Sequence, residues 1–204
     1  MFVQYVVVVA ILSCFVSLLM GQFTTGNINN TVIPKICLNM IVKNEAKVIK
    51  RLLDSVLPLI DSYCICDTGS TDGTADLIDA YMRDRGVLGK LLHEPFRDFG
   101  HTRSFALRAA IDQMDADYLL LLDADMVLQY PDGIDNDALV TLKRRVAEYD
   151  VWYVFQGTPQ FYNKNVRLIR NRPGFSYWGV THEYVQMVQG STIGTFEPVS
   201  QLYP

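Results

Sequence analysis

Two carboxylates one residue apart, Asp123 and Asp125, follow an unbroken apolar run over residues 118–122. A run without polar alternation is typical of a strand that is buried on both faces of a sheet. Acidic side chains at the end of such a strand face the crevice where open α/β sheets bind ligands. Two close carboxylates repel each other, and a divalent cation such as Mg²⁺ or Mn²⁺ relieves that repulsion. The same pattern also fits two solvated loop acids, so both interpretations stay open at this point.

A second acidic position, Asp67, ends the apolar segment 61–67 and precedes a turn that contains Gly69 and Ser70. Such a turn, when it leads into a helix, offers backbone N–H groups at the positive helix end, and glycine allows close approach of a ligand. Asp67 can accept hydrogen bonds from a nucleotide base or a ribose. An Asx-type turn with helix capping also explains the polar turn residues Ser70, Thr71 and Asp72, and it accounts less well for Asp67 at the end of an apolar strand.

The elements that must position these residues alternate along the chain between strand-like and helix-like segments. The expected strands are 36–42, 61–67, 87–93, 118–122 and 151–156, and the expected helices are 45–57, 74–82, 102–114 and 136–148. This alternation predicts an α/β fold with a mostly parallel sheet in three layers. The chain after residue 161 is expected to form hairpins and loops.

The composition is that of a globular protein, with 204 residues, 50% of them hydrophobic, and a formal net charge of −4. It predicts one well-buried domain over residues 35–204, and the absence of a basic run argues against a nucleic-acid partner. The four cysteines do not form a disulfide framework or a zinc pattern, so we expect buried thiols.

The N-terminal segment over residues 1–21 carries no charge between residues 2 and 20, a run that as a helix can just cross a bilayer. We expect a signal-anchor, with a cleaved signal peptide or a buried first element of the domain as the alternatives. Residues 22–34 then form a linker or stem that contains the sequon Asn29-Asn30-Thr31. This arrangement predicts a membrane-anchored or secretory-pathway protein with a lumenal domain.

Five sequence blocks, taken together and in order, resemble family 2 glycosyltransferases with the GT-A fold. The blocks are residues 39–45, 67–74, 99–106, 123–125 and 178–183. The resemblance extends over about residues 35–185 and implies a GT-A-like three-layer sheet. It implies metal-dependent transfer of a hexose from a nucleotide diphosphate sugar, with UDP favoured, to a glycan or other hydroxyl acceptor, with inversion.

The resemblance also assigns roles to residues. Asp125 would bind Mn²⁺ or Mg²⁺, Asp123 would contact the ribose or a metal-bound water, and His182 would be a further metal ligand or a diphosphate contact. Glu183 would be the base that deprotonates the acceptor. The residues implied to bind the nucleotide sugar are Asn44, Glu45, Asp67, Gly69, Ser70, Arg103, Asp123, Ala124 and Asp125.

Several of these side chains have a structural interpretation as well. Arg103 could contact the diphosphate, or it could be a surface residue that pairs with Asp98. Trp178, together with Tyr177, could form an apolar platform for a sugar ring, or Trp178 could belong to the core. Arg167, together with Arg170, is expected on a solvated strand face, and His93 is expected to be structural.

Two other functions fit parts of the sequence. The Asp123-Ala124-Asp125 motif also occurs in haloacid-dehalogenase-like phosphatases, which use the first Asp as a nucleophile. That fold expects the motif on its first strand, whereas here several elements precede it. A glycosyltransferase-like domain that binds nucleotide or glycan without turnover is the second alternative, because only 21 residues follow Glu183. Separate assays of donor hydrolysis and sugar transfer distinguish it from an enzyme.

Overall fold

The computed structural model describes residues 5–7, 32–130, 134–158, 161–179 and 183–196. Within these ranges one sheet of nine strands has the order β4-β3-β2-β5-β8-β7-β1-β6, and β11 pairs with β7. The strands are β1 Tyr5–Val7, β2 Ile36–Val42, β3 Ser62–Asp67, β4 Leu88–His93, β5 Tyr118–Leu121, β6 Leu128–Gln129, β7 Val151–Thr158, β8 Phe161–Arg170, β9 Ser176–Trp178, β10 Tyr184–Gln186 and β11 Ile193–Thr195. The helices are α2 Ile49–Val56, α3 Thr74–Asp84, α4 Phe99–Gln113 and α5 Asn136–Val146.

The first half of the sheet is parallel. β3 pairs with β4 and β2, and β2 pairs with β5, all in the same direction. The register places Val42 beside Asp67 and Asn39 beside Leu121. The carboxyl ends of β2, β3 and β5 therefore meet at one edge of the sheet, and the polar residues that follow these strands gather there.

The second half of the sheet is antiparallel around β8, which pairs with both β5 and β7. Leu120 of β5 lies opposite Leu168 of β8. Because β8 runs back along β5, the residue before Leu168 comes level with the end of β5, close to Asp123. This half is where the fold departs from an alternation of strands and helices.

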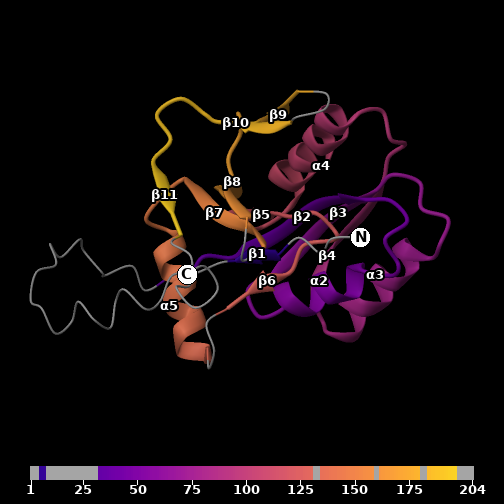
Figure 1. Cartoon of the computed structure of the whole chain (residues 1–204), viewed down its shortest axis with the longest axis horizontal. Helices are drawn as coiled ribbons and strands as arrows, with labels where there is room; N and C mark the ends of the chain where they lie inside the picture. The colour runs from indigo at the N-terminus through magenta and orange to yellow at the C-terminus, as the bar shows by residue number, and fades with distance from the viewer. Residues whose placement is uncertain (1–4, 8–31, 131–133, 159–160, 180–182, 197–204) are drawn as a thin grey trace, which may run out of the picture.

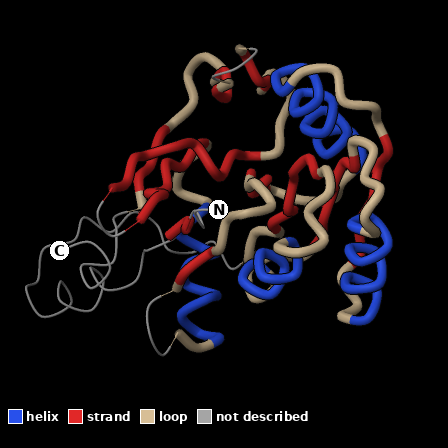
Figure 2. The backbone as a smooth tube through the Cα atoms, turned by 45° about the vertical axis from the view of Figure 1, so that its right-hand side comes forward, coloured by secondary structure: helices blue, strands red, loops and turns tan. Residues whose placement is uncertain are grey.

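Helices cover both faces of the sheet, which confirms the expected three layers (Figure 1). On one face α2, α3 and α5 pack against the sheet in a core that includes Leu38, Leu52 and Ile78. On the other face α4 and the β9–β10 hairpin form a second core around Leu107, Ile169 and Val185. Figure 2 shows the same division after the molecule is turned. Both faces of β2, β3 and β5 are thereby buried, as their apolar sequences require, whereas the edge strand β4 is largely exposed.

A buried polar side chain ties α4 to the sheet. Asn39 in β2 is only 3% exposed, and its Nδ2 donates to the carbonyl oxygens of Cys64 and Ala106, each at 2.9 Å. One side chain thus links β2, β3 and α4. A buried amide with both bonds made adds specificity to the packing without a large desolvation cost.

Two helix boundaries differ from the expectation. α2 begins at Ile49 instead of residue 45, because Asn44 takes a positive φ of 56° and the chain turns before the helix starts. α4 begins at Phe99 instead of residue 102, because Asp98 caps it and accepts a hydrogen bond from the His101 N–H at 2.7 Å. A side-chain cap sets the start of α4 only, since Val48 at the start of α2 makes no side-chain capping hydrogen bond; apolar periodicity reports neither boundary.

The apolar N-terminal segment is described only at β1, which lies between β6 and β7 in the sheet. No helix among the described residues has the length and apolar character needed to cross a membrane. Cys37, Cys64 and Cys66 are free and buried, which confirms the expectation for these three thiols.

Candidate functional site

Asp67 is enclosed by the turn that follows it. Its side chain is 4% exposed, and its carboxylate accepts hydrogen bonds from the N–H groups of Gly69 at 3.3 Å and Ser70 at 3.0 Å, and from the Ser70 hydroxyl. Gly69 has a φ of 102°, which favours glycine at this position. The Asx-type turn is therefore present, and the strand-end carboxylate is the group that organises it. His93 lies near this carboxylate, with Nδ1 3.7 Å from Asp67.

The loop after β2 is bonded to this turn. The N–H of Asn44 donates to the Ser70 hydroxyl at 2.9 Å, and the Asn44 side-chain oxygen accepts from the Thr71 N–H at 2.8 Å. The N–H of Glu45 donates to the Thr74 hydroxyl at 2.8 Å. Residues that the sequence resemblance groups around a nucleotide are thus adjacent in space, at the ends of two paired parallel strands.

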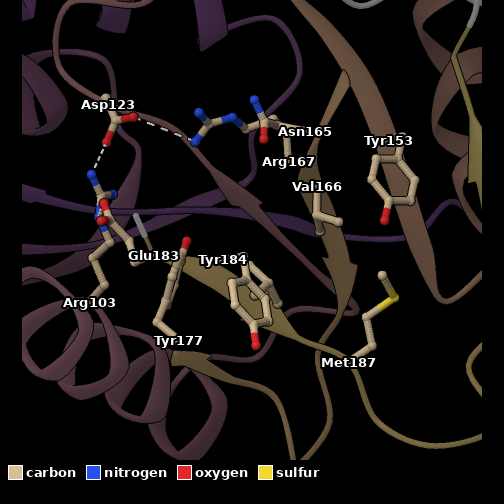
Figure 3. A pocket seen from close by; sticks show the side chains of 11 residues that line it. Arg103, Asp123, Tyr153, Asn165, Val166, Arg167, Tyr177, Glu183, Tyr184 and Met187 are labelled. Atoms are coloured by element: carbon tan, nitrogen blue, oxygen red, sulfur yellow. Dashed lines mark hydrogen bonds and ion pairs between the residues drawn. The ribbon is translucent and has the colours of Figure 1, made fainter. Parts of the chain in front are cut away.

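Asp123 is held by two guanidinium groups. Arg103 of α4 donates to it through Nη2, and Nη1 of Arg167 in β8 lies 3.5 Å away (Figure 3). Burial acts to raise the pKa of Asp123, but the two guanidiniums outweigh burial and hold this pKa below its ordinary value. The carboxylate is therefore ionised and fixed in direction.

Asp125 has a different environment. Among the described residues no cationic side chain lies within ion-pair distance of its carboxylate, although Arg51 donates to its backbone carbonyl at 3.3 Å. Burial and then repulsion from Asp123 raise the pKa of Asp125. Burial and then Asp125 also raise the pKa of Glu45. Ala124, between the two acids, is buried, and the N–H of Met126 donates to the Asp123 carbonyl, so both acids belong to one short turn.

A divalent cation fits this chemistry. Asp125 is a hard oxygen donor without an ion-pair partner in the described chain, and burial first and neighbouring carboxylates second raise the pKa of Asp125 and of Glu45. Mg²⁺ sites with phosphate ligands commonly use only one or two protein carboxylates. The described residues contain no group of three or more His, Cys, Asp or Glu side chains that could hold a metal by themselves. A cation here would thus share its coordination with a ligand.

Glu183 lies on the other side of Arg103. Nε of Arg103 donates to Oε1 of Glu183 at 3.1 Å, and the Glu183 side chain is 17% exposed. Glu183 and Asp123, 60 residues apart, are thereby joined through one guanidinium (Figure 3).

A cavity of about 280 Å³ opens beside these charged groups. Its lining combines the charged groups with aromatic and apolar side chains from the β7–β8 and β9–β10 pairs (Figure 3). The lining residues are Arg103, Asp123, Tyr153, Asn165, Val166, Arg167, Tyr177, Glu183, Tyr184, Val185 and Met187.

The surface alternative for Arg103 and the expected solvated position of Arg167 are both wrong. Arg103 is not a surface partner of Asp98, because its side chain is 13% exposed and pairs with Asp123 and Glu183. Arg167 is not on a solvated face, since it is 12% exposed and donates to Gln156 at 2.8 Å and to the Leu121 carbonyl at 3.4 Å. Only the antiparallel pairing of β5 with β8 brings Arg167 to the acids, and no local pattern in the sequence carries that information.

Of the remaining predicted site residues, Tyr177 and Trp178 lie within the described part of the chain and His182 does not. Tyr177 lines the cavity, whereas Trp178 is 63% exposed and does not line it, so Trp178 is not a core residue. His182 lies outside the described residues, and its predicted role as a metal ligand stays a prediction.

The fold and site together define an α/β protein that gathers acids, a glycine turn and two guanidiniums at the carboxyl edge of its parallel strands. The sequence model described as Glycosyl transferase family 2 matches residues 37–176, more than half of the chain. The chain therefore belongs to glycosyl transferase family 2, as the order of its motifs predicted. Membership in this family sets aside the phosphatase alternative.

Individual relatives match parts of larger proteins. A TPR repeat-containing protein of Synechococcus elongatus is 32% identical over 74% of this chain and 35% of its own length. The lipopolysaccharide core biosynthesis glycosyltransferase LpsC of Rhizobium meliloti is 29% identical over 70% of this chain and 54% of its own length. The chain therefore spans between 35% and 54% of these two curated relatives.

Among solved structures, the mannosyltransferase PcManGT of Pyrobaculum calidifontis, in complex with GDP-Man and Mn²⁺, superposes with a TM-score of 0.47 at 21% identity. That alignment covers 60% of this chain and 35% of PcManGT. TarS of S. aureus in complex with UDP superposes with a TM-score of 0.43 at 23% identity, over 58% of this chain and 34% of TarS.

Proposed function

We propose that this protein transfers a hexose from a nucleotide diphosphate sugar, with UDP favoured, to a hydroxyl acceptor such as a glycan, with a divalent cation and with inversion. The observation that carries the proposal is the contrast between the two acids of the motif. Asp123 is fixed by two guanidiniums, while Asp125 keeps a carboxylate without an ion pair in the described chain. Family membership supports the same class of reaction.

The nucleotide would lie against the loops that follow β2 and β3. Asp67 already accepts three bonds within its turn, and a carboxylate has room for a further donor from a base or ribose. Asn44, Glu45, Gly69 and Ser70 form the rest of this surface. The fixed carboxylate of Asp123 would accept from a ribose hydroxyl, because its orientation is set before the ligand arrives.

Asp125 would hold Mn²⁺ or Mg²⁺, with Asp123 close by and His182 as the further predicted ligand. When bound, such a cation neutralises the charge that develops on the departing diphosphate. Arg103 would add a second source of positive charge. Its Nε and Nη2 are used by Glu183 and Asp123, so Nη1 is the nitrogen that can donate to a phosphate oxygen while both pairs persist.

Glu183 would act as the base that takes the proton of the acceptor hydroxyl. It lies at the cavity and is held by Arg103 through Oε1 only, among the bonds of the described residues. Its second oxygen is then the one that faces an incoming hydroxyl group. Trp178, exposed on the neighbouring strand, would contact the acceptor outside the cavity.

The membrane association predicted for residues 1–21 would place this reaction at a membrane surface or in a secretory lumen. It is part of the proposal, and its only support is the apolar sequence of that segment.

The test is a screen of nucleotide sugars for thermal stabilisation of the full chain, with and without Mn²⁺. A ligand at about 100 times its Kd adds about 2.7 kcal/mol to the free energy of unfolding. In a chain of this size that corresponds to about 5–10 °C in Tm. We expect Asp125→Ala to abolish the Mn²⁺-dependent part of the shift.

The matched control is Asp112→Ala, which removes an exposed carboxylate from α4. This control should keep the full Mn²⁺-dependent shift. If Asp125→Ala also keeps it, the metal assignment is wrong. Donor hydrolysis and sugar transfer are then measured separately, and donor binding without either reaction would favour the non-catalytic alternative.

A further inference from the structure

The cavity beside Asp123 has two chemically distinct sides. One side carries two guanidiniums and two carboxylates, from Arg103, Arg167, Asp123 and Glu183. The other side carries the rings of three tyrosines together with valine and methionine side chains (Figure 3). An aromatic and apolar wall that faces a dense polar wall fits a ligand with both C–H faces and many hydroxyl groups.

On the polar side of the cavity, the positive charges of the two arginines balance the negative charges of the two carboxylates. Arg103 donates to Glu183 and to Asp123, and Nη1 of Arg167 lies 3.5 Å from Asp123 while its Nε donates to Gln156. Every charged lining residue in the described chain therefore already has a partner of opposite sign. The polar lining that remains is the Asn165 amide and the tyrosine hydroxyls, all of which are neutral.

This balance decides which ligands can enter. An anionic substituent on a sugar ring loses its hydration in the cavity, and among the described lining residues both arginines already share their charge with carboxylates. A neutral hydroxyl group loses less hydration, and it can bond to the remaining N–H and oxygen sites of paired arginines and carboxylates. Lys164 is not a lining residue, although its Nζ lies 5.9 Å from the centre of the ring of Tyr153, which is one.

We propose that this cavity binds one uncharged pyranose ring and discriminates against sugars that carry a carboxylate, sulfate or phosphate. The volume of about 280 Å³ supports a single ring, since pockets for larger ligands run from about 300 to 1,000 Å³. The inference rests on the proposed glycosyl transfer, because it defines the sugar that reaches Asp123 and Glu183. The ring is either the sugar of the donor or the terminal sugar of the acceptor.

The experiment is a titration of the full chain, saturated with UDP and Mn²⁺, followed by ligand-observed NMR. The probes are uncharged methyl gluco-, galacto- and mannopyranosides and, for comparison, methyl glucuronopyranoside. We expect at least one neutral glycoside to bind about tenfold more tightly than the glucuronide, because an unpaired charge near a protein surface costs more than 1.4 kcal/mol at short range. Repeating the titration with an intact nucleotide sugar identifies the source of the ring. Displacement of the glycoside assigns the cavity to the donor sugar, and simultaneous binding assigns it to the acceptor.

Two variants test the charge argument directly. Glu183→Gln leaves Arg103 with one carboxylate fewer and should reduce the preference for neutral glycosides about tenfold. Tyr184→Lys adds an ammonium group at the cavity and leaves the ion pairs unchanged, so it should also reduce the preference for neutral glycosides. This second variant tests the charge argument even if Glu183→Gln does not fold. The matched control is Leu88→Lys, an exposed position on strand β4 that is outside the cavity lining. Its effect should be small.

Three outcomes overturn the inference: no glycoside binds, the glucuronide binds as well as the neutral glycosides, or Tyr184→Lys folds and leaves the preference unchanged. Failure of the proposed function is a separate result. It appears as absence of Mn²⁺-dependent UDP binding, which is measured before any glycoside is added.

Discussion

Replacement of Arg103 by leucine tests the arrangement on which the site depends. The guanidinium of Arg103 is the common partner of Asp123 and Glu183, whose side chains are 28% and 17% exposed. Loss of one partner from a buried ion pair costs about 3–5 kcal/mol, and surface pairs are worth only about 0–1 kcal/mol. Because these carboxylates are partly exposed, the cost should lie between the values for buried and surface ion pairs. Asp123 also keeps its ion pair with Arg167 in the variant. We expect a loss of about 2–3 kcal/mol in the free energy of unfolding.

Urea denaturation of the full chain measures this loss, and a Tm decrease of about 5–10 °C should accompany it. The control is Arg108→Leu, which removes an exposed arginine from the same helix and should change stability by no more than about 0.5 kcal/mol. The double variant Arg103→Leu/Glu183→Gln should recover about 1 kcal/mol, because the orphaned carboxylate is gone. Equal stability of Arg103→Leu and Arg108→Leu would refute the buried network.

Three further predictions concern single positions. Glu183→Gln should keep nucleotide-sugar affinity and lose transfer, since only the proton acceptor is removed; unchanged turnover would exclude Glu183 as the base. Gly100→Ala would place a Cβ in steric conflict with the carbonyl oxygen of Gly179, so we expect about 1–3 kcal/mol of destabilisation in urea, and wild-type stability would show that α4 and the hairpin are not in this contact. Asp150 accepts bonds from Thr192 and Arg170, which lower its pKa below the ordinary 3.8. Its contribution is therefore complete above pH 3.8 and lost as the pH falls through the lower folded value, so the stability deficit of Asp150→Asn should shrink in acid; a constant deficit would contradict the assignment.

The sequence predicts the parallel half of the fold well because apolar runs and strand-end acids are local signals. Asp67, Asp123 and Asn44 lie at the carboxyl ends of neighbouring strands, as their positions in the chain indicated. The network around Asp123 was not predictable in the same way. Arg167 reaches it only because β8 inserts antiparallel beside β5, and strand order is a property of the whole sheet.

The ion pairs at the cavity were also not predictable from the sequence. The predicted base Glu183 lies at the cavity together with Asp123, but the ion pair through Arg103 joins residues from α4, the turn after β5 and the chain before β10. Neither partner could be chosen from spacing, and pairing of Arg103 with the nearby Asp98 was the simpler local expectation. Contacts between residues distant in sequence depend on helix placement, which composition and periodicity do not specify.

The side-chain amide of Asn39 fixes the position of helix α4 on the sheet. Its two hydrogen bonds fix Ala106 against β2 and β3, and Ala106 is one turn beyond Arg103. A change in side-chain length at position 39 would therefore displace the arginine head group along the helix axis, although the two residues share no chemistry. Directed variation of the proposed sugar specificity should leave position 39 unchanged and vary the cavity wall instead.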